Sequence, residues 1–288
     1  MRPDDWHLTE DLDDFLAGGG DFLRSQPALH TTQLTTMERL RTRGSAQHGD
    51  RAPLFGRLER TGRVEATFHR LSPSRGLAPT SLTPEQADTL ATRLADLGHA
   101  LPYVTADEGT ATAFAEAWQR HTGAQPKLRV RLHLYRLGTL TPPQPLPEGR
   151  GRVAGEEDQA QVAHWCHEFA AAVDEVLPAS WTDTRFADKH FTFWETPDGT
   201  PVSLAGSTAK IGGMVRVDPV YTPPHLRGRG YAAAVTTEVT RAALATGAKE
   251  IVLFTDPGNP TSNALYQRLG YVLITDWAVY DFSDAAQE

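Results

Sequence analysis

The chain has 288 residues, of which 40% are hydrophobic and 22% charged, so it is long enough for two medium-sized domains with packed cores. A net charge of -8 at pH 7 argues against general attraction to nucleic acid or to an anionic membrane surface, and we expect neither as a partner. No segment resembles a membrane span or a signal peptide, and the single Cys166 excludes an intrachain disulfide, so we expect a cytoplasmic protein.

The first half of the chain predicts alternating helices and strands. Thr83-Pro84-Glu85-Gln86 has the pattern of a helix start, and Gly98 and Gly123 suit the position after a helix end. Hydrophobic periodicity predicts helices at 11–23, 35–43, 83–98 and 110–121, and strands at 53–60, 64–71, 103–105 and 128–137.

A proline-rich segment separates the two halves. The segment at 141–151 contains four prolines, which favour an extended path without a core of its own. We therefore expect domains at 1–140 and 152–288, joined by this linker.

The second half predicts a similar alternation. Glu156-Glu157-Asp158 places acids in the first turn of a helix, where the helix dipole favours them. The segment 251–255 is apolar almost throughout, as in a central strand buried on both faces. The predicted strands are 152–154, 190–194, 201–206, 211–220, 251–255 and a final strand pair over 271–282, and the predicted helices are 156–176, 231–246 and 260–270.

The two halves share a short pattern. Trp118-Gln119-Arg120 precedes Gly123 much as Tyr266-Gln267-Arg268 precedes Gly270. This similarity favours a diverged duplication, and two unrelated α/β halves stay open as the alternative.

The segment Arg227-Gly228-Arg229-Gly230 connects a predicted strand to a predicted helix. Two glycines allow close approach of a ligand, and the unpaired N–H groups and dipole of the helix start suit an anion such as phosphate. Taken alone, this pattern is equally typical of a tight turn. It is not a nucleotide-binding loop of the Walker type, and it lacks the third glycine of dinucleotide-binding folds.

The loop fits R-x-x-G-x-G/A, with Arg227, Gly230 and Ala232 at the fixed positions. Residues 259–271 fit a second pattern, N-x-x-A/S-x-x-x-Y-x-x-x-G-F/Y, on the next predicted helix. With both motifs the chain resembles the GNAT acetyltransferase superfamily over about residues 150–282. The resemblance implies an α/β (α+β) fold of two tandem GNAT-like domains, each a mostly antiparallel mixed sheet flanked by helices. The first domain is degenerate, because the segment 77–84 lacks the loop motif.

The resemblance also implies a site. The fourth and fifth strands of a GNAT fold separate and accept the pantetheine arm of acetyl-coenzyme A, and the helix tyrosine, here Tyr266, protonates the leaving thiolate. The residues expected to bind the cofactor are Val220, Tyr221, Thr222, Arg227, Gly228, Arg229, Gly230, Tyr231, Ala232, Asn259, Ser262, Asn263 and Tyr266.

The general base does not follow from the motifs. Asp218 is the candidate that we select, because it lies on the strand that leads to the site, and Glu195 and His225 stay open as alternatives. Each of these three residues is also typical of an ordinary surface or turn position.

The acceptor side is predicted to lie on the first helix of the second domain and the loop after it. Aromatic residues there alternate with acids, which suits an amine on a partly apolar molecule, although buried aromatics beside a solvated acidic face explain the pattern equally well. These residues are Trp165, Phe169, Trp181, Phe186, Asp174, Glu175, Asp183 and Asp188. His164, Cys166 and His167 do not share one helix face, so we expect no metal.

The sequence therefore predicts an N-acetyltransferase that transfers acetyl from acetyl-coenzyme A to a primary amine by direct attack. We expect a small-molecule amine rather than a protein lysine as acceptor, and a monomer or homodimer. A non-catalytic acyl-coenzyme A sensor and an enzyme for longer acyl groups stay open as alternatives.

Overall fold

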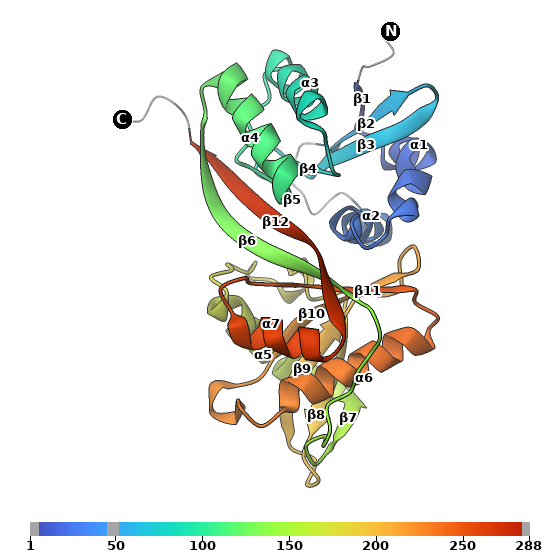
Figure 1. Ribbon diagram of the computed structural model, residues 1–288, viewed down its shortest axis with the longest axis vertical. Coiled ribbons are helices and arrows are strands. Elements are labelled where there is room, and N and C mark those ends of the chain that lie inside the picture. The colour runs from blue at the N-terminus through green and yellow to red at the C-terminus, as the bar shows by residue number, and fades with distance from the viewer. Residues whose placement is uncertain (1–5, 45–51, 284–288) are drawn as a thin grey trace. The chain divides into compact units, whose positions relative to one another are not determined.

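The computed structural model describes residues 6–44 and 52–283, which form two compact units (Figure 1). The first unit contains residues up to Leu134 together with the chain from Ile274, and the second contains Tyr135–Leu273. This division differs from the predicted boundaries, because residues after 273 cluster with the first unit and residues 135–140 with the second. The acidic start of the chain, residues 1–5, lies outside the described part.

The first unit holds a four-stranded antiparallel sheet in the order β1-β2-β3-β4. A further antiparallel pair joins β5 to β12, from Asp107 opposite Trp277 to Tyr103 opposite Asp281. Its elements are β1 (Trp6–Thr9), α1 (Leu12–Ser25), α2 (Thr31–Arg43), β2 (Leu54–Arg60), β3 (Arg63–Arg70), β4 (Ala78–Pro79), α3 (Pro84–Asp96), β5 (Tyr103–Asp107), α4 (Glu108–Thr122) and most of β6 (Gln125–Leu137) and β12 (Tyr271–Ser283).

The second unit contains the two sequence motifs, at 227–232 and 259–271, and the strands next to them. Within it the strand order is β6-β11-β10-β9-β8-β7, antiparallel from β7 to β10 and parallel between β10 and β11. Its elements are β7 (Arg150–Val153), η2 (Glu156–Asp158), α5 (Gln159–Ala172), η3 (Trp181–Asp183), β8 (His190–Glu195), β9 (Pro201–Ser207), β10 (Met214–Tyr221), η4 (Pro224–Leu226), α6 (Tyr231–Ala245), β11 (Glu250–Thr255) and α7 (Pro260–Arg268).

Two separate cores cover the two faces of this second sheet. Neighbouring residues of a strand point to opposite faces, and Leu204 packs in the core under α5 whereas Ala205 packs in the core under α6 and α7. Val215 and Val217 also belong to the α6 side, which places Arg216 between them on the α5 side. The sheet thus has an α6/α7 face and an α5 face.

The mixed α/β fold and nearly all predicted elements are confirmed. The predicted final strand pair is wrong, because Tyr271–Ser283 forms one continuous strand of 13 residues. The first helix of the second unit is also shorter than predicted and ends at Ala172, and β1 and β4 were not predicted. No helix in the described ranges is long and apolar enough to cross a membrane.

Candidate active site

Strands β10 and β11 pair over only part of their length. The parallel register joins Met214, Val215 and Arg216 to Glu250, Ile251 and Val252, and no pairing continues beyond Arg216 and Val252 in the described chain. A register shift between Val217 and Val220 on the β9 side bends β10 at the same point. The two strands therefore open next to Val220, Tyr221 and Thr222, the residues that the family resemblance implies for the pantetheine arm.

The loop before α6 leaves a run of backbone donors free. Gly228 and Gly230 both have positive φ, at 77° and 81°, a conformation that favours glycine. Among the described residues, the N–H groups from Gly228 to Ala233 donate no hydrogen bond, and the first helical bond is from Ala234 to the Gly230 carbonyl. Six consecutive free donors at a helix start form a ready anion site.

Two arginines flank this run. Arg227 Nε donates to the Thr222 carbonyl at 3.0 Å, which ties the loop to the end of β10. Arg229 Nη2 lies 3.4 Å from the His225 carbonyl, so this exposed guanidinium keeps most of its donors for a ligand. The predicted loop residues Arg227 to Ala232 are thus all brought to one helix end.

By contrast, the start of α3 in the first unit has a capping box that uses its backbone donors. Thr83 Oγ1 accepts from the Gln86 N–H at 3.2 Å, and Gln86 Oε1 accepts from the Thr83 N–H at 3.0 Å. The Leu82 N–H donates to Thr110 Oγ1 at 2.8 Å. Because this helix start satisfies its own donors, it offers no comparable anion site.

The second motif places its polar residues around the start of α7. Asn259 caps the helix by accepting from the Ser262 N–H at 3.0 Å. Asn263 donates to the carbonyls of Asp256 and Asn259, each at 2.8 Å, and so holds the loop after β11 in shape. Asn259 and Asn263 therefore have structural contacts of their own at the predicted site.

Tyr266 lies in the core of the α6/α7 face and is 8% exposed. Its ring packs edge-on against Tyr271, with the ring centroids 6.0 Å apart. Within the described chain its hydroxyl makes no hydrogen bond, so the donor is free. Burial, Tyr271 and Asp218 raise the pKa of Tyr266 above its ordinary value, which keeps the phenol protonated at neutral pH.

Asp218 lies on the α5 face, where it forms ion pairs with both Arg185 and Lys189. Burial raises the pKa of Asp218, but Arg185, Lys189 and Arg216 outweigh it and hold the pKa well below its usual range. A carboxylate held by cations in this way is a weak proton acceptor. The geometry therefore speaks against the predicted role of Asp218 as the general base.

Among the cations near Asp218, Lys189 is the one that loses its proton most easily. Its side chain is 4% exposed. Burial lowers the pKa of Lys189 to about 7, with Asp218 opposing the shift and Arg185 and Arg216 adding to it. Lys189 is thus a buried amine that exchanges a proton near neutral pH.

A family model for the GNAT acetyltransferase family matches residues 159–271, which include both motifs and the opened strand pair. Residues 159–271 form a GNAT acetyltransferase domain. The family assignment supports acyl transfer as the chemistry of this domain. None of the curated proteins searched matches the chain.

Solved structures extend this likeness to the whole fold. A GCN5-related N-acetyltransferase from Sphaerobacter thermophilus is 16% identical, with a TM-score of 0.59 over 99% of this chain and 96% of that one. A related protein from Kribbella flavida is 18% identical, with a TM-score of 0.54 over 86% and 95%. A tandem GNAT protein from the clavulanic acid biosynthesis pathway is 12% identical, with a TM-score of 0.58 over 99% and 100%. At these identities the likeness concerns the fold, and it shows a two-domain GNAT fold.

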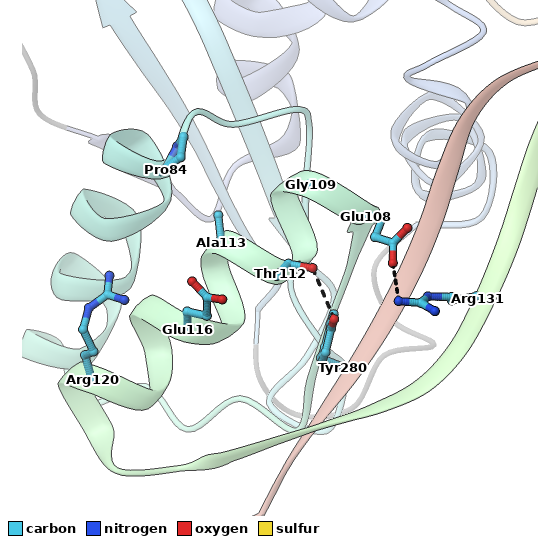
Figure 2. Close-up of a pocket in the computed structure, with 9 residues that line it drawn as sticks. All are labelled: Pro84, Glu108, Gly109, Thr112, Ala113, Glu116, Arg120, Arg131 and Tyr280. Carbon is cyan, nitrogen blue, oxygen red and sulfur yellow. Dashed lines mark hydrogen bonds and ion pairs between the residues drawn. The ribbon is translucent and has the colours of Figure 1, made fainter.

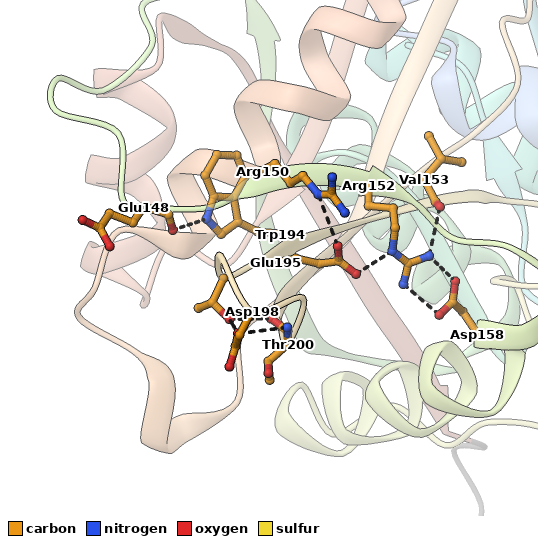
Figure 3. A network of polar contacts seen from close by, with 10 residues as sticks. Glu148, Arg150, Arg152, Val153, Asp158, Trp194, Glu195, Asp198 and Thr200 are labelled. Atoms are coloured by element: carbon orange, nitrogen blue, oxygen red, sulfur yellow. Dashed lines mark hydrogen bonds and ion pairs between the residues drawn. The ribbon is translucent and has the colours of Figure 1, made fainter.

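Glu195, an alternative base, is tied into the edge of the GNAT domain (Figure 3). Its carboxylate is 4% exposed and accepts from Arg152 Nε at 2.5 Å, with Arg150 Nε 3.7 Å away. Arg152 also pairs with Asp158 at 2.6 Å. This network joins β7 and β8 to the start of α5, and it holds the buried Glu195 carboxylate between two arginines, which makes it a weak proton acceptor. His225 is exposed on η4.

The aromatic residues predicted for the acceptor side are largely core residues. Trp165 and Phe186 are 7% and 0% exposed and pack with Tyr221 under α5. Of the acids, Glu175 pairs with Arg185 at 2.7 Å. The alternative explanation, buried aromatics beside a polar face, therefore describes most of this group.

A pocket of about 570 Å³ lies in the first unit, outside the GNAT domain (Figure 2). Two of its contacts are an ion pair from Arg131 to Glu108 at 2.6 Å and a hydrogen bond between Thr112 and Tyr280 at 3.2 Å. It is lined by Pro84, Glu108, Gly109, Thr112, Ala113, Glu116, Arg120, Arg131 and Tyr280. None of these residues carries a predicted role. In the described part of the chain, no cluster of three or more His, Cys, Asp or Glu is arranged to hold a metal.

Three residues at or near the candidate site were not predicted from the sequence. Lys189 and Arg216 lie beside Asp218, and Tyr135 contacts α7. Arg216 had a signal, since it is a charged residue between two apolar residues of a predicted strand. Lys189 and Tyr135 had none, because their neighbours in space are distant in the sequence.

Proposed function

We propose that the protein is an N-acetyltransferase that moves the acetyl group of acetyl-coenzyme A to a primary amine on a small molecule. The observation that carries this proposal is the run of free N–H groups from Gly228 to Ala233, which lies at the end of the strand that parts from its neighbour. The run suits the pyrophosphate of the coenzyme, and Arg227 and Arg229 add positive charge.

The opened strand pair suits the pantetheine arm. Backbone groups of β10 near Val220 and Tyr221 no longer pair with β11, so they are free to bond an amide-containing chain laid between the strands. The same backbone donors suit the thioester carbonyl, and they stabilise the negative charge that develops on its oxygen during attack.

The transfer itself is a direct displacement. The lone pair of the neutral amine forms a bond to the carbonyl carbon, and the tetrahedral intermediate then breaks its carbon–sulfur bond. The free hydroxyl of Tyr266 gives its proton to the departing thiolate. The proton that the nitrogen of the intermediate loses is transferred through solvent back to the tyrosine, so that the neutral amine and acetyl-coenzyme A give coenzyme A and the amide.

The amine must be neutral before it attacks. We assign Lys189, rather than Asp218, as the group that takes a proton from the ammonium form of the amine and then releases that proton to solvent. Lys189 exchanges a proton near pH 7, whereas Asp218 is held as a carboxylate by its cationic neighbours. Asp218 then has the role of positioning Lys189, with which it pairs directly.

A covalent acyl-enzyme on cysteine does not fit this site. Cys166 is fully buried, and burial raises the pKa of its thiol to about 12. At neutral pH almost none of it is the nucleophilic thiolate. This supports direct attack by the acceptor amine.

Mass spectrometry of reaction products tests the proposal. The protein is incubated with acetyl-coenzyme A and a panel of small primary amines, and each amine is examined for a gain of one acetyl group. We expect at least one acetylated amine and no acetylated Cys166. Turnover of acetyl-coenzyme A without any acetylated amine, or a stoichiometric acetyl-cysteine, would contradict direct acetyl transfer.

A further inference from the structure

Five charged side chains gather on the α5 face of the GNAT domain, where β10 leaves β11. Arg185 pairs with Glu175 at 2.7 Å and also with Asp218, and Lys189 pairs with Asp218 as well. Arg216 is close enough to affect the protonation of both Lys189 and Asp218. These side chains come from β10, from the segment before β8 and from the segment after α5.

Arg216 is the unsatisfied member of this group. It is the last residue of β10 that pairs with β11, opposite Val252, so its side chain leaves the sheet where the strands begin to open. Within residues 6–44 and 52–283, its guanidinium forms no ion pair or hydrogen bond, and its Nε is sealed from solvent without a partner. A half-buried guanidinium without an acceptor is costly unless a ligand supplies one.

No carboxylate of this group is left for Arg216. Glu175 and Asp218 are both bonded to Arg185, and Asp218 also pairs with Lys189. The group reaches solvent on one side, since the side chains of Asp218 and Arg185 are 20% and 34% exposed. An anion can therefore enter the group, and it would supply the acceptor that the Arg216 guanidinium lacks.

Resting on the proposed function, we infer that the acceptor is an amine that also carries a carboxylate, and that Arg216 binds this carboxylate. The planar fork of donors on a guanidinium matches the two oxygens of a carboxylate. The amine of such an acceptor then lies near Lys189, on the α5 face. Tyr266, on the other face of the same strands, is close enough to Asp218 to respond to its charge.

Matched acceptor pairs test this inference. Each pair consists of an amino acid and the amide of the same amino acid, which keeps the amine and removes the negative charge. Steady-state rates with acetyl-coenzyme A are measured for wild type and for Arg216→Gln. We expect wild type to prefer the amino acid by about 10- to 100-fold in kcat/KM, mostly through KM, and the variant to lose this preference.

Two further variants make the result specific. Arg241, on the exposed side of α6 and paired with Glu238 at 2.7 Å, provides the control Arg241→Gln, which we expect to keep the full preference. Arg216→Lys keeps the charge without the fork, and we expect an intermediate preference. Thermal unfolding and acetyl-coenzyme A calorimetry on each variant separate a loss of recognition from a loss of fold.

The outcomes separate the inference from the proposed function. Normal binding of acetyl-coenzyme A, with equal rates for amino acids and their amides or with no acetylation of any amino acid, would overturn the inference alone. A preference that survives in folded Arg216→Gln would also overturn it. Failure of wild type to bind acetyl-coenzyme A would overturn the proposed function, and the inference with it.

Discussion

Gln267 on α7 donates from Nε2 to the hydroxyl of Tyr135 at 3.0 Å, across 132 residues of sequence. The same hydroxyl donates to Asn263 Oδ1 at 3.2 Å, and Tyr135 is 1% exposed. Asn263 and Gln267 lie one turn apart on α7, with Tyr266 between them in the sequence. A tyrosine of β6 therefore fixes the helix that presents the proposed acid.

Replacing Tyr135 tests this support. Tyr135→Phe removes the hydroxyl that bonds both Gln267 and Asn263, so we expect a loss of about 1–2 kcal/mol in the free energy of unfolding and a lower kcat. Urea denaturation and steady-state kinetics measure the two effects. Tyr280→Phe, which removes a hydroxyl bonded to Thr112 at 3.2 Å in the first unit, is the control and should leave kcat unchanged. An equal kcat for Tyr135→Phe and wild type would show that Tyr135 is not needed to hold α7 in its active position.

Tyr266→Phe removes the proposed proton donor while keeping the ring in the core. We expect turnover to fall by about 100-fold with little change in acetyl-coenzyme A affinity, because the hydroxyl acts on the departing thiolate. Tyr271→Phe is the matched control. Its hydroxyl is bonded to Thr240 at 2.7 Å, so that change should lower stability rather than turnover. Unchanged turnover in Tyr266→Phe would remove this residue from the mechanism.

The pH dependence of kcat/KM tests Lys189. The neutral amine is the active form, so activity should rise with pH through about 7, the pKa of Lys189. Burial is the main cause of this lowered pKa, and the charged groups that face Lys189 are Asp218, which raises the pKa, and Arg185 and Arg216, which lower it. Lys189→Arg keeps a permanent charge, so it should be poorly active from pH 6 to 9 without the rise near 7. A rise near pH 7 that persists in this variant would assign it to another group.

His69 makes the first unit sensitive to acid. Its Nδ1 is sealed from solvent without a partner, and burial lowers its pKa from 6.5 to about 4. Because the folded pKa is the lower one, the unfolded chain binds more protons between pH 6.5 and 4, and stability falls as the pH drops through this range. At pH 4 this effect lowers the free energy of unfolding by roughly 3 kcal/mol relative to neutral pH. Between pH 7 and pH 4 the thermal unfolding temperature should fall less for His69→Gln than for wild type. Equal falls in the two proteins would contradict this role of His69.

Local patterns predicted most of the fold. Gly230 and Pro260 marked the starts of α6 and α7, and apolar runs marked β8, β9 and β11, because these signals are contained within each element. The last strand was misread as two, since nothing within residues 271–283 shows that one continuous strand contributes to both compact units. That outcome depends on partners such as β5, which are remote in sequence.

The candidate site was also predictable only in part. The loop at Arg227–Ala232 was predictable because the free donors of a helix start follow from glycine and chain direction alone. The role of Asp218 was not, because its strength as a base depends on Arg185 and Lys189, about thirty residues away and folded against it. Charge balance in a partly buried group is a property of the assembled sheet rather than of any single segment.

Calorimetry with acetyl-coenzyme A tests most directly whether the loop before α6 binds the coenzyme. Gly230→Glu places a negative charge among the free donors, and Gly199→Glu makes the same change at an exposed turn with a similar φ, 87° against 81°. We expect binding by wild type and by Gly199→Glu, and a loss of at least about 100-fold in affinity for Gly230→Glu. No binding by wild type, or equal affinity in folded Gly230→Glu, would contradict this expectation.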